Sequence, residues 1–157
     1  MYGKHCRLQV ADVALLVADN GFYAIPNLQL YGDNREPGRN LHDTARDGNL
    51  LLRDSFEAAH GTAAGRSTVA PFFLFERTSP GWAVRFRGLL APGAETLSAD
   101  DDLNAIWRSK GGLRFQNYRA KFSLLDVPEV SRHWIDDLVA GVPPTESDSV
   151  PVPGASG

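Results

Sequence analysis

The stretch from residue 28 to residue 52, LQLYGDNREPGRNLHDTARDGNLLL, has the glycines and prolines of a loop and many groups that could hold a ligand. Glycine lets a backbone approach a ligand closely. Tyr31 could stack on a planar group, and Asp33 could accept a hydrogen bond from a base amino group, as carboxylates do from cytosine. Arg35 and Arg39 could hold phosphates. A polar surface loop with internal salt bridges explains the same composition, because turns select these residue types anyway.

A second stretch, WRSKGGLRFQNYRAK from residue 107 to residue 121, carries five cations and no acid. Cations attract phosphates, aromatic rings stack on bases, and amide side chains can read base edges. The candidate DNA contacts in this stretch are Arg108, Lys110, Arg114, Gln116, Asn117, Tyr118 and Arg119. The alternative is a solvated strand whose aromatic residues belong to the core.

Other chemistries have little support in the sequence. The histidines His5, His42, His60 and His133 show no metal-ligand spacing, and the single Cys6 provides neither a disulfide nor a zinc site. We find no nucleophile elbow, phosphate-binding loop or dinucleotide motif. We therefore expect no catalytic residue, no metal and no cofactor. The acids at residues 100–102 fit the N-terminus of a helix, which favours negative charge.

Length and composition indicate one ordinary globular domain. The chain has 157 residues, 43% of them hydrophobic, and a net charge of −3, so only a local patch could attract nucleic acid. We predict a domain over residues 1–141 and a Pro-rich linker or disordered tail over residues 142–157. No apolar run is long enough to cross a membrane. A single cysteine suits a reducing compartment, and we expect a cytoplasmic protein.

Hydrophobic patterning predicts a mixture of helices and strands. Residues 22–31 are expected to be extended, 49–60 to form a helix with Gly61 as its C-terminal cap, and 98–110 to form a helix that ends at Gly111 and Gly112. Residues 72–77 and 82–90 predict a β-hairpin with a turn at TSPG. Residues 114–127 predict a strand, and 127–141 a helix started by a proline.

Three ordered blocks resemble a known family. They are YGDNREPGRNLHDTARDGNLLL, then PFFLFER with WAVRFRGLLAPG, then DDLNAIWR, LRFQNYRAKFSLLDV and VSRHWIDDL. Together they are similar to the modified-cytosine-reading domains of modification-dependent (type IV) restriction endonucleases of bacteria: the AspBHI-like N-terminal domains and the SRA-like (SET- and RING-associated) domains of MspJI-like and McrA-like enzymes. The similarity covers about residues 31–138.

This resemblance implies an α+β fold, a curved, partly closed β-barrel with flanking helices. It implies a phage-defence protein that binds duplex DNA and flips 5-methylcytosine or 5-hydroxymethylcytosine into a pocket, without catalytic activity of its own. A nuclease domain of the Mrr/PD-(D/E)XK or HNH type would follow in the parent protein. Tyr31 matches the stacking aromatic of the pocket, and Asn49 matches a helix cap that positions the pocket loop.

The family's upstream strand pattern is matched poorly before Tyr31. The acid that reads the base could therefore be Asp19 or Asp33, and Phe22 or Tyr23 would form the second wall of the pocket. Two alternatives remain. One is a small metal-dependent nuclease subunit that uses the following acids and histidine: Asp33, His42 and Asp43. The other is a domain whose basic strand binds an acidic protein.

Overall fold

The computed structural model describes residues 28–67, 69–77, 83–93, 97–125, 129–143 and 146–151. Within them, the strands are β1 (Leu28–Tyr31), β2 (Phe72–Arg77), β3 (Val84–Pro92), β4 (Leu103–Lys110) and β5 (Leu113–Leu125). The helices are α2 (Gly48–His60), α3 (Ala63–Ser67), α4 (Ala99–Asp102) and α5 (Arg132–Ala140). None of these helices has the length and apolar character needed to span a membrane.

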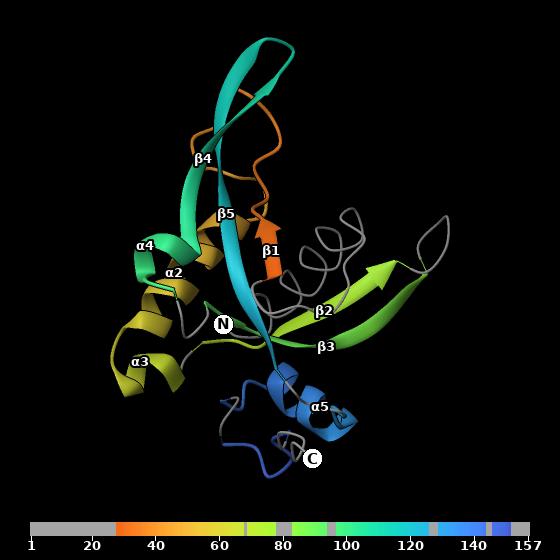
Figure 1. Cartoon of the computed structure of the whole chain (residues 1–157). Helices are drawn as coiled ribbons and strands as arrows, with labels where there is room; N and C mark the ends of the chain where they lie inside the picture. Colours follow the sequence, from red (N-terminus) through yellow and green to blue (C-terminus); the bar gives the residue numbers. More distant parts are fainter. Residues whose placement is uncertain are drawn as a thin grey trace.

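The sheet is built around β5. Its order is β1, β5, β3, β2, with β4 also paired to β5, and every pairing is antiparallel (Figure 1). Ala120 of β5 lies opposite Leu30 of β1 on one edge and Leu103 of β4 on the other. Phe122 lies between β1 and β3 in the same way. Strands β4 and β3 therefore pair with successive segments of the same edge of β5, and β1 pairs with the opposite edge.

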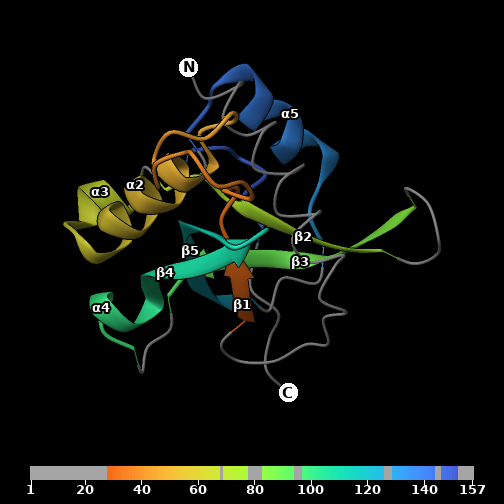
Figure 2. The same ribbon diagram turned by 90° about the horizontal axis from the view of Figure 1, so that it is seen from above.

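Two hydrophobic cores form because consecutive residues of β2 point to opposite faces. Phe72 belongs to the first core, where its ring lies 4.9 Å from that of Phe122, and Phe122 in turn contacts Phe56 of α2. Phe73 belongs to the second core, where its ring lies 6.0 Å from that of Trp134 of α5. Helix α2 thus covers one face of the sheet (Figure 2), and α5 closes the second core.

The predicted helix over residues 98–110 is wrong. Only α4 is helical, and β4 begins at Leu103 and pairs with β5 along its whole length. Gly111 (φ 59°) and Gly112 (φ 76°) do not end a helix. They form the two-residue turn of a β-hairpin, for which two consecutive left-handed residues are the preferred geometry. The apolar spacing suited a helix, but a long strand beside it offered a complete ladder of hydrogen bonds.

The other predicted elements within the described residues are confirmed, with small shifts in their bounds. Helix α2, the β2–β3 pair and strand β5 lie where we expected them, and the extended segment includes β1. Helix α5 is not started by a proline: Ser131 caps it by accepting a hydrogen bond from the N–H of Trp134. Gly141, with φ 90°, ends it.

Two broader expectations concern the closure of the sheet and the C-terminal segment. The described strands form an open sheet, and closure into a barrel is not observed among them. Within the predicted tail, the side chain of Ser147 is buried and its hydroxyl donates a 2.5 Å hydrogen bond to Asp137 of α5, and the division at residue 141 stays a prediction. The pocket candidates Asp19, Phe22 and Tyr23 lie outside the described residues.

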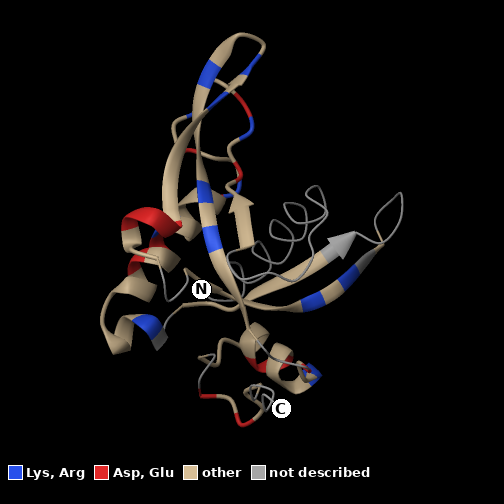
Figure 3. Ribbon diagram, in the orientation of Figure 1, with Lys and Arg blue, Asp and Glu red and all other residues tan. Residues whose placement is uncertain are grey.

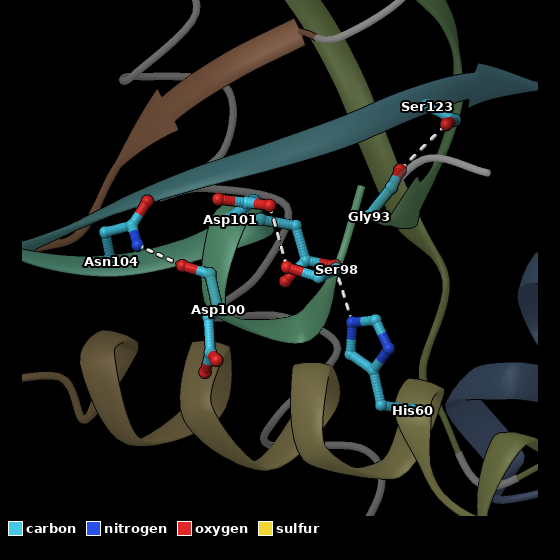
Figure 4. A network of polar contacts seen from close by, with 8 residues as sticks. His60, Gly93, Ser98, Asp100, Asp101, Asn104 and Ser123 are labelled. Atoms are coloured by element: carbon cyan, nitrogen blue, oxygen red, sulfur yellow. Dashed lines mark hydrogen bonds and ion pairs between the residues drawn. The ribbon is translucent and has the colours of Figure 1, made fainter. Parts of the chain in front are cut away.

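A buried acid ties the C-terminal end of α2 to the start of β4. The Nε2 atom of His60 lies 2.5 Å from Oδ2 of Asp102, whose side chain is completely buried. Figure 4 shows the His60 ring reaching from α2 toward the α4 turn that carries Ser98 and Asp101. Gly93 passes so close that a Cβ there would lie 2.5 Å from Asp102 Oδ2. Oδ1 of Asp102 has no hydrogen-bond partner among the described residues, so His60 is the group that stabilises this carboxylate.

Replacing His60 with Ala should lower the free energy of unfolding by about 2–3 kcal/mol, because it leaves a buried carboxylate without its donor. Chemical denaturation would measure the change. His133→Ala is the matched control, since His133 is exposed on α5. Equal unfolding midpoints for the two variants would contradict the anchoring role of His60.

Candidate nucleic-acid interface

The outer part of the β4–β5 hairpin extends beyond the rest of the sheet (Figure 1). We call residues 104–118 the finger. It carries three exposed cations, Arg108, Lys110 and Arg114. Figure 3 shows bands of Lys and Arg along this hairpin, whereas acids gather at α4 and alternate with the arginines of the neighbouring loop. The finger is therefore a locally cationic surface on a protein whose net charge is −3, and local charge of this kind attracts phosphates.

Cation–aromatic contacts hold two of these arginines. The guanidinium of Arg114 lies 4.6 Å from the centre of the Trp107 ring, and that of Arg108 lies 5.0 Å from the centre of the Tyr31 ring. Such contacts stabilise by about 0.5–1 kcal/mol at exposed sites. They also restrict the side chains, so that the arginines are partly ordered before any ligand arrives.

A loop runs along the edge of β5 that faces away from β4. We call residues 32–47 the edge loop. The N–H of Gly32 donates to the carbonyl of Tyr118 (2.9 Å), and the side-chain amide of Asn34 donates to the carbonyl of Gln116 (2.8 Å). In return, the side-chain amide of Asn117 donates to the carbonyl of Gly32 (3.0 Å). Asparagine side chains thus continue the hydrogen-bond ladder of β1 past its end.

A buried amide network fixes the edge loop to the sheet and to α2. Oδ1 of Asn49 accepts from the N–H of Asp33, and Nδ2 of Asn49 donates to the carbonyl of Leu41 and to Oδ1 of Asn117. The same Asn117 oxygen accepts from the N–H of Asn34 at 3.3 Å. The three asparagines are at most 2% exposed. Buried polar groups of this kind are costly unless they are paired.

Gly32 is required where the loop enters this network. A Cβ at this position would lie 1.7 Å from Oδ1 of Asn49 and 2.5 Å from Oδ1 of Asn117. These are buried amides held by several hydrogen bonds, so they have no room to move away. A glycine is therefore the residue that lets the backbone pass.

Asp33 caps helix α2 from a distant point in the chain. Its Oδ2 accepts from the N–H of Gly48 and its Oδ1 from the N–H of Asn49, both at 3.0 Å. These N–H groups have no partner inside the helix, and a negative charge is favoured there. Asp47 occupies the N-cap position in a left-handed conformation and makes no cap bond with its side chain. Of the two roles open to Asp33, the structure therefore supports fixing the loop.

Tyr31, the expected stacking residue, is half-buried at the end of β1. Its hydroxyl accepts a hydrogen bond from the side chain of Gln29 at 2.8 Å, and Arg108 covers its ring. Arg35 and Arg39 are exposed in the edge loop. Asn49 lies inside α2 instead of at its N-cap, but its side chain holds the loop as the resemblance implied.

Two predicted DNA contacts are placed in the interior. Asn117 is 2% exposed with its amide fully engaged, and Tyr118 is buried with its hydroxyl 2.8 Å from Nε2 of His42. Burial raises the pKa of the Tyr118 hydroxyl. Gln116 and Arg119 are half-buried, and Arg119 makes a 3.4 Å contact with Asn104. The alternation of polar and apolar residues in this segment predicted a strand, but it did not indicate which face of the strand would be buried.

The residues of the alternative metal site are not brought together. Asp33 caps α2, His42 contacts Tyr118, and Asp43 is exposed. Among the described residues, no group of three His, Cys, Asp or Glu side chains could hold a metal ion. The stacking role that the sequence allowed Trp107 is compatible with its exposure on the finger, whereas the exposure of Leu113 beside the turn follows only from the register of β4 with β5.

Comparisons with known proteins find similar chains among restriction endonucleases. Residues 23–151 match the family described as restriction endonuclease AspBHI N-terminal. The chain is 44% identical to the solved DNA modification-dependent restriction endonuclease AspBHI, with a TM-score of 0.70, and the match covers 75% of this chain and 54% of that one. It is 36% identical to the DNA recognition domain of the cytosine modification-dependent restriction endonuclease LpnPI, with a TM-score of 0.67 and coverage of 83% and 64%.

A more distant structure shares the fold alone. The MspJI restriction endonuclease, solved in complex with a 27-mer oligonucleotide, is 22% identical with a TM-score of 0.55, and the match covers 72% of this chain and 26% of that one. The chain thus spans about half to two thirds of the length of the first two structures. No curated protein matches it significantly.

Exchanging Asn117 for Asp should destabilise the protein by at least about 2 kcal/mol, because a carboxylate oxygen would replace the amide that donates to Gly32. Hydrogen exchange of the edge-loop amides should speed up in parallel. Gln116→Glu introduces the same charge one residue away at a half-buried position and serves as the control in denaturant unfolding. The network would not be the anchor of the loop if both variants lost the same stability.

Proposed function

The chain belongs to the family of restriction endonuclease AspBHI N-terminal domains, and we propose that it recognises a modified cytosine in duplex DNA. The observation that carries the proposal is the cationic finger beside an edge loop that a buried amide network holds in place. Phosphate contacts position a protein on DNA, and a rigid loop beside them can present a reading site. The similarity to the LpnPI recognition domain supports the same role.

The proposed mechanism is base flipping. A flipped base needs an aromatic face to stack on, an acceptor for its amino group and apolar space for the methyl group. We assign the stacking role to Tyr31 and the second wall to Phe22 or Tyr23. Because both oxygens of Asp33 are engaged by α2, we assign the base-reading acid to Asp19. The modified base would be 5-methylcytosine or 5-hydroxymethylcytosine.

Exposed cations would hold the backbone of the duplex. They lie on the finger and on the edge loop, and Arg119 adds a half-buried guanidinium at the base of the finger. The proposed phosphate contacts are Arg35, Arg39, Arg108, Lys110, Arg114 and Arg119. Of these, Lys110 also contacts Glu36 of the edge loop, so its charge is shared between holding the loop and attracting DNA.

We propose that the chain acts as a reader module without catalytic activity of its own. The parent protein would be a bacterial restriction endonuclease that carries a nuclease domain, of the Mrr/PD-(D/E)XK or HNH type, and cuts modified phage DNA. The chain by itself, incubated with modified duplex and Mg²⁺ or Mn²⁺, should leave the DNA intact.

Binding should depend on the modification and on Tyr31. Gel shifts at one stated salt concentration would compare otherwise identical duplexes with cytosine, 5-methylcytosine or 5-hydroxymethylcytosine. Tyr31→Ala should weaken binding of the preferred duplex by about 1–3 kcal/mol, whereas Tyr31→Phe, which keeps the ring, should change it little. Equal affinity for the three duplexes would rule out recognition of the modification, although not DNA binding.

Arg114→Ala should weaken binding to modified and unmodified duplexes alike. Losing one phosphate contact should also flatten the dependence of log K on log salt concentration by about 0.9. The matched control is Arg132→Ala, which removes an exposed arginine of α5 that pairs with Asp136. If the control flattened the slope as much as Arg114→Ala, the finger would not be the phosphate-binding surface.

A further inference from the structure

The finger exposes two large apolar side chains. Trp107 is 58% exposed and Leu113 is 64% exposed. Leu113 follows the Gly111–Gly112 turn directly and lies opposite Lys110, whereas Trp107 lies opposite Gln116, farther back along the hairpin. Polar residues would serve a solvated hairpin tip equally well, so these positions point to a partner with apolar surface.

The charge around the tip restricts the chemistry of that partner. Residues 103–121 contain no acid, and Arg108, Lys110 and Arg114 are exposed along the same hairpin, where Lys110 pairs with Glu36 of the edge loop. A matching partner must therefore carry negative charge at the rim of a groove and apolar surface at the floor of that groove. Duplex DNA has this arrangement, because its phosphates flank grooves whose floors are formed by stacked bases.

The dimensions of the finger also fit a groove. The major groove is about 8.5 Å deep and admits a two-stranded β-ribbon. At about 3.3 Å per residue, Trp107 lies roughly 10 Å back from Lys110 along β4. When the turn reaches the groove floor, Leu113 meets the bases and Trp107 lies at the rim. Arg114, held 4.6 Å from the Trp107 ring, is then placed at the height of the phosphates.

We propose that Leu113 is a base-contacting residue at the leading end of the finger, and that the Trp107–Arg114 pair supports it against the sugar–phosphate backbone. This inference rests on the proposed DNA-binding function. It adds an apolar contact with the base stack at a place separate from the modified-base pocket that we assign around Tyr31.

The experiment compares Leu113→Ala with Val139→Ala. Val139 is 66% exposed on α5, so the control removes an equally exposed aliphatic side chain outside the finger. Leu113→Ala should weaken duplex binding by about tenfold and leave the slope of log K against log salt unchanged, because no ionic contact is lost. Val139→Ala should bind as the wild type does, and neither variant should change the thermal unfolding midpoint.

A duplex with 2-aminopurine at successive positions provides a second readout. Wild-type binding should change the fluorescence at the base step that Leu113 contacts, and Leu113→Ala should lose that change while Val139→Ala keeps it. The inference would be overturned if Leu113→Ala bound the duplex with wild-type affinity and gave the wild-type fluorescence pattern. That result would also be expected if the tip of the finger bound an acidic protein instead of DNA. If the wild type bound no duplex at all, the proposed function itself would fail.

Discussion

The functional surface depends on one constraint, the pairing of buried amide groups between Asn49 and Asn117. Each amide bonds to backbone groups of the edge loop as well as to its partner, so moving the loop would leave several buried polar groups unpaired. Among the network's side-chain atoms, Oδ1 of Asn34 alone lacks a partner within the described residues. Leaving such groups unpaired costs about 1–3 kcal/mol each. The loop is thus held without a hydrophobic core of its own.

Helix α2 transmits this constraint to the finger because it is anchored at both ends. At its N-terminus, Asp33 and Asn49 exchange hydrogen bonds between the edge loop and the helix. At its C-terminus, His60 holds the buried Asp102, which directly precedes β4. The first core then packs Phe56 of α2 against Phe122 of β5. Helix α2 is therefore attached to both strands of the finger and to the edge loop. These attachments fix the positions of the three segments relative to one another.

Sequence patterning predicted elements whose signals were local. Helix α2, the β2–β3 pair and α5 each carry an apolar period and end signals within one segment. The β4 segment was mistaken for a helix because its identity as a strand depends on pairing with β5, and Gly111–Gly112 fits a helix end as well as a hairpin turn. The role of Asp33 could not be deduced either, since its partners lie 15 and 16 residues away in the chain.

Polar residues that complete the fold could not be distinguished by sequence from those that remain available to a partner. In composition, Asn117 and Asp33 resembled DNA contacts as closely as Arg114 did, because ligand sites and loops select the same residue types. Burial separates them: the amide and the carboxylate complete the fold, while the exposed arginines and the apolar tip of the finger remain available to a partner. With these neutral polar side chains buried, the DNA binding that we propose would act mainly through charge and shape. Discrimination between bases would then come from the pocket that we propose beside the edge loop, where Tyr31 ends β1.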